Sequence, residues 1–173
     1  MLGLKLPTDP YWVKIVERNI DEILTDHAYC EQKAATNAIN LVIRYPEYTD
    51  LVTAMVELAR EELQHFDMVH ERIKERGGFL GQERRDDYVW ELNKFIRKGH
   101  AKHITLIDRL LFAALVEARS CERFKVLAEN IKDAELSAFY KELMISEANH
   151  YTTFIGFARQ YASGENVDKR WQE

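Results

Sequence analysis

The chain has 173 residues, of which 46% are hydrophobic and 31% are charged, enough for one domain with a sizeable core. Its formal net charge of −5 argues against a surface coated with basic side chains, although a local basic patch remains compatible with it. The longest apolar run, residues 110–116, is too short to span a bilayer, and residues 1–10 lack the apolar stretch of a signal peptide. We therefore expect a single domain over residues 1–173, located in the cytoplasm and without a membrane partner.

Helical periodicity dominates the chain and predicts an all-α fold. Thr8-Asp9-Pro10 is typical of a helix start, and helical periodicity, with room for a bend, continues from there to residue 44, before Pro46. A second long helix is expected from residues 48–50 to residue 76, where two glycines follow. A shorter helix is expected over residues 88–98, and two further long helices over residues 103–131 and 133–162.

The lengths of the connections predict how the long helices are joined. The first link and the last link are only a few residues long, so the helices on either side of each should form an antiparallel hairpin. The segment over residues 77–102 is long enough to cross the length of a helix bundle. A single crossover of this kind predicts an up-down-down-up four-helix bundle.

Two of the long helices carry the same pattern, Glu-x-x-His, at Glu62–His65 and Glu147–His150. Residues three apart lie on one face of a helix, so each copy offers a carboxylate oxygen and an imidazole nitrogen to the same metal ion. Two such motifs, with one inward glutamate from each of two other helices, form the dinuclear site of ferritin-like bundles. The pattern therefore predicts a ferritin-like bundle, provided that the two other glutamates exist.

Each of the other two long helices has one glutamate within its apolar stripe. Glu117 interrupts such a stripe, whereas the neighbouring Glu122 shares a face with charged residues and is expected to be solvated. Glu31 lies in the corresponding stripe of the first long helix. The predicted metal ligands, through which catalysis would proceed, are Glu31, Glu62, His65, Glu117, Glu147 and His150.

Four buried carboxylates need compensating positive charge. Each buried ion carries an effective penalty of several kcal/mol, so four of them would exceed the roughly 5–15 kcal/mol stability of a domain. Two divalent cations would balance the four carboxylates, and mixed oxygen and nitrogen ligands suit iron or manganese. The alternative is a network of buried salt bridges or partly exposed carboxylates. His27, one turn from Glu31, is expected to support a ligand or fill the core.

The local sequences at residues 59–66, 117–124 and 146–151 surround these ligands, and Glu-Ala-Arg-Ser-Cys-Glu-Arg-Phe at 117–124 is the most specific. They resemble the MiaE family of tRNA hydroxylases, and the resemblance covers nearly the whole chain. It implies a nonheme diiron monooxygenase that hydroxylates the isopentenyl group of a hypermodified adenosine, 2-methylthio-N6-isopentenyladenosine. It maps the family's ligands onto the same six residues.

The same resemblance implies the cofactors and partners. The cofactors are two iron ions (Fe2+/Fe3+), with dioxygen as co-substrate. The partners are the anticodon stem-loop of tRNA and an external electron donor, such as a reductase or a ferredoxin-like protein.

Binding of tRNA requires phosphate contacts even from an acidic protein. Basic residues gather in the segment between the second and third long helices. The candidate RNA contacts are Lys94, Arg97, Lys98 and Lys102, with His100 and His103 beside them, and Arg84 and Arg85 as a second group. A solvated charged face is the alternative interpretation of these runs.

Two other functions fit parts of the pattern. Demethoxyubiquinone hydroxylases also carry two Glu-x-x-His motifs in a chain of this size, but they need an apolar membrane-facing surface, and none is obvious here. Ferritin-like iron-storage proteins share the bundle, but ferritin cages generally lack the second Glu-x-x-His. We therefore expect an oxygenase, with a diiron hydroxylase of another substrate or an iron-storage protein as the alternatives.

Overall fold

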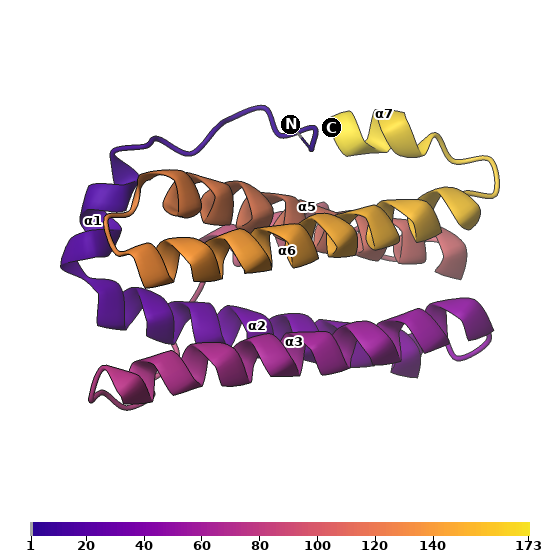
Figure 1. Cartoon of the computed structure of the whole chain (residues 1–173). Coiled ribbons are helices and arrows are strands. Elements are labelled where there is room, and N and C mark those ends of the chain that lie inside the picture. The colour runs from indigo at the N-terminus through magenta and orange to yellow at the C-terminus, as the bar shows by residue number, and fades with distance from the viewer. Residues whose placement is uncertain (1) are drawn as a thin grey trace. The chain divides into compact units, whose positions relative to one another are not determined.

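The computed structural model describes residues 2–173 and confirms the expected all-α architecture, without a strand among those residues (Figure 1). The helices are α1 (Trp12–Arg18), α2 (Ile20–Arg44), α3 (Thr49–Glu75), α4 (Asp87–Leu92), the 3-10 helix η1 (Asn93–Phe95), α5 (Lys102–Asn130), α6 (Ala134–Gln160) and α7 (Val167–Gln172). The chain forms two compact units. The first unit is Lys14–Arg85, and the second is residues 2–13 together with Asp86–Glu173.

The first unit is built on the hairpin of α2 and α3, which pack against each other along their length (Figure 1). Each helix buries one apolar stripe, which includes Leu24 and Leu41 on α2 and Met55 and Val69 on α3. Helix α3 ends at Glu75, and Gly77 follows with a φ of +77°, a left-handed conformation that glycine adopts without strain. The Gly78 N–H then donates to the Ile73 carbonyl at 3.0 Å, which closes the last turn of α3.

The second unit is built on the hairpin of α5 and α6 (Figure 1). Asp133 begins α6, since its side chain accepts hydrogen bonds from the N–H groups of Glu135 and Leu136 at 3.0 and 3.1 Å. Leu110 and Phe154 are among the apolar side chains that fill the core of this unit. Both expected hairpins are therefore present, and their helix ends lie within a few residues of the predicted ones.

Three local features of the structure add to the sequence-based expectations or differ from them. The first helical stretch is divided at Asn19 into α1 and α2, as the allowance for a bend permitted. The helix expected over residues 88–98 ends earlier, because buried Ile96 takes an extended conformation and the Arg97 N–H donates to Asp108 instead of a helical carbonyl. The short helix α7 was not expected, and Asn166 caps it by accepting from the Lys169 N–H at 2.9 Å.

Glu122 is not on a solvated face, so that expectation was wrong. Its side chain is buried and accepts hydrogen bonds from the backbone N–H and, at 2.7 Å, the hydroxyl of Thr8. Arg119, one turn earlier on α5, also donates to Glu122 at 2.7 Å. Glu122 therefore holds the N-terminal segment of the second unit against α5.

Asp108, on α5, binds two arginines from distant parts of the second unit. Arg97 donates to its two carboxylate oxygens from Nε and Nη2, both at 2.9 Å, and Arg170 of α7 donates from Nε at 3.0 Å. The Asp108 side chain is buried, and bidentate pairs with arginine are among the stronger charge-assisted hydrogen bonds. This cluster joins the segment after η1 and the C-terminal helix to α5.

The Asp108 cluster should make stability depend on pH. Burial by itself raises the pKa of Asp108, but hydrogen bonds from Arg97 and Arg170 outweigh it and hold the pKa below its ordinary value. A carboxyl whose folded-state pKa is lowered stabilises the fold above its unfolded pKa of about 3.9, and this stabilisation is lost as pH falls through the folded value. Asp108→Asn weakens the charge-assisted hydrogen bonds to both arginines and should therefore cost about 1.5–3 kcal/mol at pH 7 and progressively less below pH 4.

Chemical unfolding of the metal-free protein at pH 7 and pH 3 measures this difference. Asp168→Asn is the matched control, since Asp168 pairs with Arg159 but is exposed and should contribute less than about 1 kcal/mol. A loss for Asp108→Asn that is equal at both pH values would contradict the assignment.

Candidate metal centre

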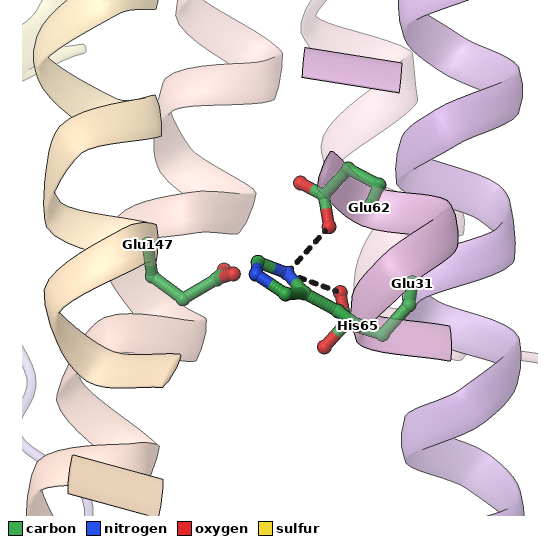
Figure 2. Close-up of side chains that lie close together, drawn as sticks. All are labelled: Glu31, Glu62, His65 and Glu147. Atoms are coloured by element: carbon green, nitrogen blue, oxygen red, sulfur yellow. Dashed lines mark hydrogen bonds and ion pairs between the residues drawn. The ribbon is translucent and has the colours of Figure 1, made fainter. Parts of the chain in front are cut away.

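The first unit brings together three of the six predicted ligands on the facing sides of α2 and α3. Glu31, Glu62 and His65 are buried, and each offers one ligand atom within 4.8 Å of the others. His65 Nδ1 lies 3.3 Å from a carboxylate oxygen of Glu62 and 3.9 Å from one of Glu31 (Figure 2). Two carboxylates and one imidazole thus converge on a small volume.

The apolar stripes explain why these polar groups point inward. Glu31 lies between Ala28 and Ala35 on α2, one turn from each, and both alanines are buried. Glu62 follows Leu58 by four residues on α3, and Leu58 is buried as well. Because residues four apart share a helix face, burial of these neighbours turns the carboxylates toward the same core.

His27 contacts one of the predicted ligands. Its Nε2 lies 2.5 Å from a carboxylate oxygen of Glu31, and both side chains are buried. Burial, helped by the nearby His65 and opposed by Glu62, lowers the pKa of His27 to about 3, so the ring is neutral at pH 7. A neutral ring can donate from Nε2 to Glu31 and so fix the orientation of that carboxylate.

Loss of His27 should weaken metal binding without removing a predicted ligand. Groups that orient a metal ligand typically contribute 10–100-fold to metal affinity, so His27→Ala should lower the affinity for Fe2+ or Mn2+ by about that factor. Anaerobic calorimetric titration measures it. His100→Ala is the control, because His100 is exposed and outside both groups. Equal affinities for His27→Ala and the control would exclude this role.

The second unit holds the other three predicted ligands on α5 and α6. Glu117, Glu147 and His150 are buried, and each offers a ligand atom within 4.8 Å of the others. His150 Nδ1 lies 3.9 Å from a carboxylate oxygen of Glu147, the residue that Figure 2 shows on α6. This group has the same composition as the group in the first unit, with two carboxylates and one imidazole.

The donor set of each group fits a divalent transition metal. Carboxylate oxygens and imidazole nitrogens are the ligands of nonheme iron and manganese, and neither group contains the thiolates that zinc and copper(I) prefer. Burying two carboxylates in each unit costs several kcal/mol per charge unless a cation lies beside them. Both groups can therefore hold a metal ion.

The candidate RNA-binding cations lie mostly on the surface. Five of the candidate RNA-binding residues are exposed, namely Arg84, Arg85, Lys94, Lys98 and Lys102. Arg97 differs, because its guanidinium is bound by Asp108 and, at 2.9 Å, by Glu165. Asp108 lies between buried Leu106 and Leu110, and an aspartate in this apolar stripe is the sequence feature that indicates an inward-facing partner for Arg97.

A family model described as tRNA-(MS[2]IO[6]A)-hydroxylase (MiaE) matches residues 2–173. Two curated relatives carry the name tRNA 2-(methylsulfanyl)-N(6)-isopentenyladenosine(37) hydroxylase. The one from Pseudomonas putida is 37% identical over 95% of this chain and 78% of its own length. The one from Salmonella typhimurium is 31% identical over 96% of this chain and 78% of its own length.

A solved structure is also similar to the chain. It is named Protein 43 with aldehyde deformylating oxygenase activity, from Synechococcus, and it matches with a TM-score of 0.92 and 38% sequence identity over 98% of this chain and 84% of its own length. This likeness confirms the expected ferritin-like class of all-α fold. Within residues 2–173, no helix combines the length and the apolar character needed to cross a membrane.

Proposed function

The chain belongs to the MiaE family of tRNA hydroxylases, and from this we propose that it uses dioxygen to hydroxylate the isopentenyl group of the modified adenosine next to the tRNA anticodon. The observation that carries the proposal is the pair of buried groups, each with two glutamates and one histidine. The proposed substrate is inferred from the similarity to named tRNA hydroxylases, and the proposed class of reaction is inferred from the chemistry of the two groups. The proposal includes a single functional domain over residues 1–173 and the cytoplasm as its location.

We propose that the two groups together bind two iron ions. Their four carboxylates carry the charge that balances two divalent cations when the imidazoles are neutral. The proposed ligands are Glu31, Glu62, His65, Glu117, Glu147 and His150. Iron held by such ligands would supply the reactivity toward dioxygen, and the oxidising power toward a C–H bond, that protein side chains lack.

The residues of the chain would bind and orient the metal and limit access of water. His27 holds the Glu31 carboxylate through its Nε2–H, and Leu110 and Phe154 belong to the apolar cores of the helices that carry the ligands. An apolar surrounding excludes water, and so protects a reactive oxidant from side reactions. The protein would thus contribute the metal ligands, a fixed orientation of those ligands and an apolar surrounding that excludes water.

The proposed reaction balances with an external reductant. One C–H bond of the isopentenyl group and one dioxygen molecule give one C–OH group and one water molecule, with two electrons and two protons taken up. The proposed source of those electrons is a separate protein, a reductase or a ferredoxin-like protein.

Nucleoside analysis of tRNA tests the substrate and the reaction together. Cells with the gene should contain the hydroxylated isopentenyl nucleoside, and cells without it should accumulate the unhydroxylated form. Complementation with the wild-type gene should restore hydroxylation, whereas a Glu147→Gln gene should not. Identical nucleoside profiles with and without the gene would contradict the proposed function.

The similar solved structure gives a specific reason to test a second reaction, deformylation of aldehydes. The purified iron-loaded chain should be incubated with an aldehyde and a reductant, and the release of formate should be measured. Formate release without tRNA hydroxylation would favour this second function.

Two other outcomes would favour the remaining alternatives. Iron loading far beyond two ions per chain would favour iron storage. Hydroxylation of demethoxyubiquinone would favour a diiron hydroxylase of that substrate.

A further inference from the structure

The second unit exposes two large aromatic side chains beside a run of cations. Trp90, on α4, is 49% exposed, and Phe95, in η1, is 61% exposed. The sequence from residue 92 to residue 107 contains no acidic side chain, and its lysines at 94, 98 and 102 are exposed. We refer to residues 90–102 as the aromatic–basic segment.

Contacts with the rest of the second unit hold the backbone of the aromatic–basic segment in place. Ile96 is buried, and Arg97 donates to Asp108 from its backbone N–H at 2.8 Å and from its guanidinium. Arg170 donates both to Asp108 and to the carbonyl of Phe95. Since Ile96 and Arg97 make the inward contacts, the exposed rings of Trp90 and Phe95 are presented from an ordered support.

A cation already lies over one of the two rings. Lys94 Nζ is 3.6 Å from the centre of the Trp90 ring and 2.6 Å from a carboxylate oxygen of Glu91. Cations over an indole face are attracted by its electron density. Lys94 therefore places a positive charge over one face of the half-exposed Trp90 ring, where it can attract the phosphate of a nucleotide that binds beside this ring.

Exposed aromatic faces with adjacent lysines fit single-stranded RNA. Proteins bind unpaired bases by stacking them on aromatic side chains, and they bind the connecting phosphates with cations. We infer that the aromatic–basic segment binds the unpaired loop of the tRNA substrate, with Trp90 and Phe95 stacking on bases and with lysines 94, 98 and 102 contacting phosphates. This inference rests on the proposed function, and it assigns Arg97 to support of the segment instead of RNA contact.

An anionic membrane surface also attracts cations and aromatic side chains, but it fits this segment less well. Membrane-surface helices bury a continuous apolar face. The helix α4 has only six residues, and Trp90 and Phe95 are the only strongly exposed large apolar side chains of the segment. Flat aromatic faces separated by lysines match bases and phosphates more closely than lipid chains.

Binding of a fluorescent anticodon stem-loop that carries the isopentenyl adenosine tests the inference. The iron-loaded full chain should be compared with Trp90→Leu and Phe95→Leu by anisotropy over a range of salt concentrations. Loss of one stacked base should weaken binding at least about fivefold. The dependence of affinity on salt should stay as in the wild type, because the stacking variants remove no charge.

Lys98→Glu tests the phosphate contacts separately. It should weaken binding and also lower the slope of log affinity against log salt by about one. Two control variants lie in the same unit: Tyr11→Leu removes another exposed aromatic side chain, and Lys141→Glu reverses another exposed lysine. Both controls should bind the stem-loop with the affinity of the wild type.

The outcomes separate this inference from the proposed function. Tight binding by the wild type with equal affinities for Trp90→Leu, Phe95→Leu and Tyr11→Leu would overturn the inference and leave the proposed function intact. Absence of stem-loop binding by the wild type would overturn both. Unchanged RNA binding by Trp90→Leu, with loss of binding to phosphatidylserine vesicles, would overturn the RNA assignment in favour of a membrane surface.

Discussion

Replacing Glu117 with glutamine is expected to reduce tRNA hydroxylation by more than about a hundredfold and to leave fewer than two iron ions per chain. Groups that merely orient metal ligands contribute 10–100-fold, so loss of a ligand should cost more. Glutamine keeps the size of the side chain but removes its negative charge. The second unit would then offer one carboxylate instead of two, and the amide oxygen is a weaker ligand than a carboxylate.

Iron content and turnover should be measured on the same protein preparations. Glu142→Gln is the matched control, since Glu142 is an exposed glutamate on α6, outside both ligand groups. Circular dichroism should show equal helicity in the wild type and both variants, so that loss of activity is not loss of fold. Wild-type turnover in Glu117→Gln would rule out this residue as a ligand of the working centre.

Removal of metal is expected to lower the thermal stability of the protein strongly. A ligand that binds only the folded state stabilises it by about 2.7 kcal/mol at a concentration one hundred times its Kd, so two such ions would contribute about 5 kcal/mol. For a chain of this length each kcal/mol shifts Tm by about 2–4 °C. The Tm of the Fe2+- or Mn2+-loaded protein should therefore exceed that of the metal-free protein by about 10–20 °C.

Anaerobic scanning calorimetry with and without a chelator measures the shift. His150→Ala should reduce it, because the second unit would lose its only imidazole among the predicted ligands. His100→Ala, at an exposed position, should leave the shift unchanged. Equal Tm values for loaded and metal-free wild type would show that the buried groups do not bind the ions in the folded state.

The long helices were predictable from the sequence because their signals are local. Apolar periodicity marked the buried stripes, Pro46 marked the end of one helix, and Gly77 marked the end of another. The same periodicity predicted the inward position of Glu31 and Glu117, since a polar residue within an apolar stripe faces the core, whereas the repeated Glu-x-x-His motif identified the other four ligands; all six are buried.

Contacts between distant residues were not predictable in this way. Glu122 was expected to be solvated because it shares a helix face with charged residues, and no local pattern indicated its partner Thr8, which lies 114 residues away in the chain. Asp108 binds Arg170 across 62 residues, and no periodic pattern connects them. The short helix α7 has only six residues, fewer than two helical turns, which is too short for apolar periodicity to indicate a helix.

The association of His27 with Glu31 combines a feature that local sequence predicts with one that depends on the tertiary structure. Their spacing of four residues placed them on one face of the helix, which the sequence predicted. The low pKa of His27 required the surrounding core and the nearby His65, which only the folded structure provides. Local spacing thus identified the pair, and tertiary burial determined its protonation.

Incorporation of labelled oxygen tests the central proposal most directly. The purified iron-loaded chain should be given a reductant, 18O2 and tRNA that carries the isopentenyl adenosine, and the nucleosides should be analysed by mass spectrometry. We predict a hydroxylated nucleoside that contains one 18O atom, formed by the wild type and not by Glu117→Gln. Recovery of only the unhydroxylated nucleoside, or of a product whose oxygen comes from water, would contradict the account.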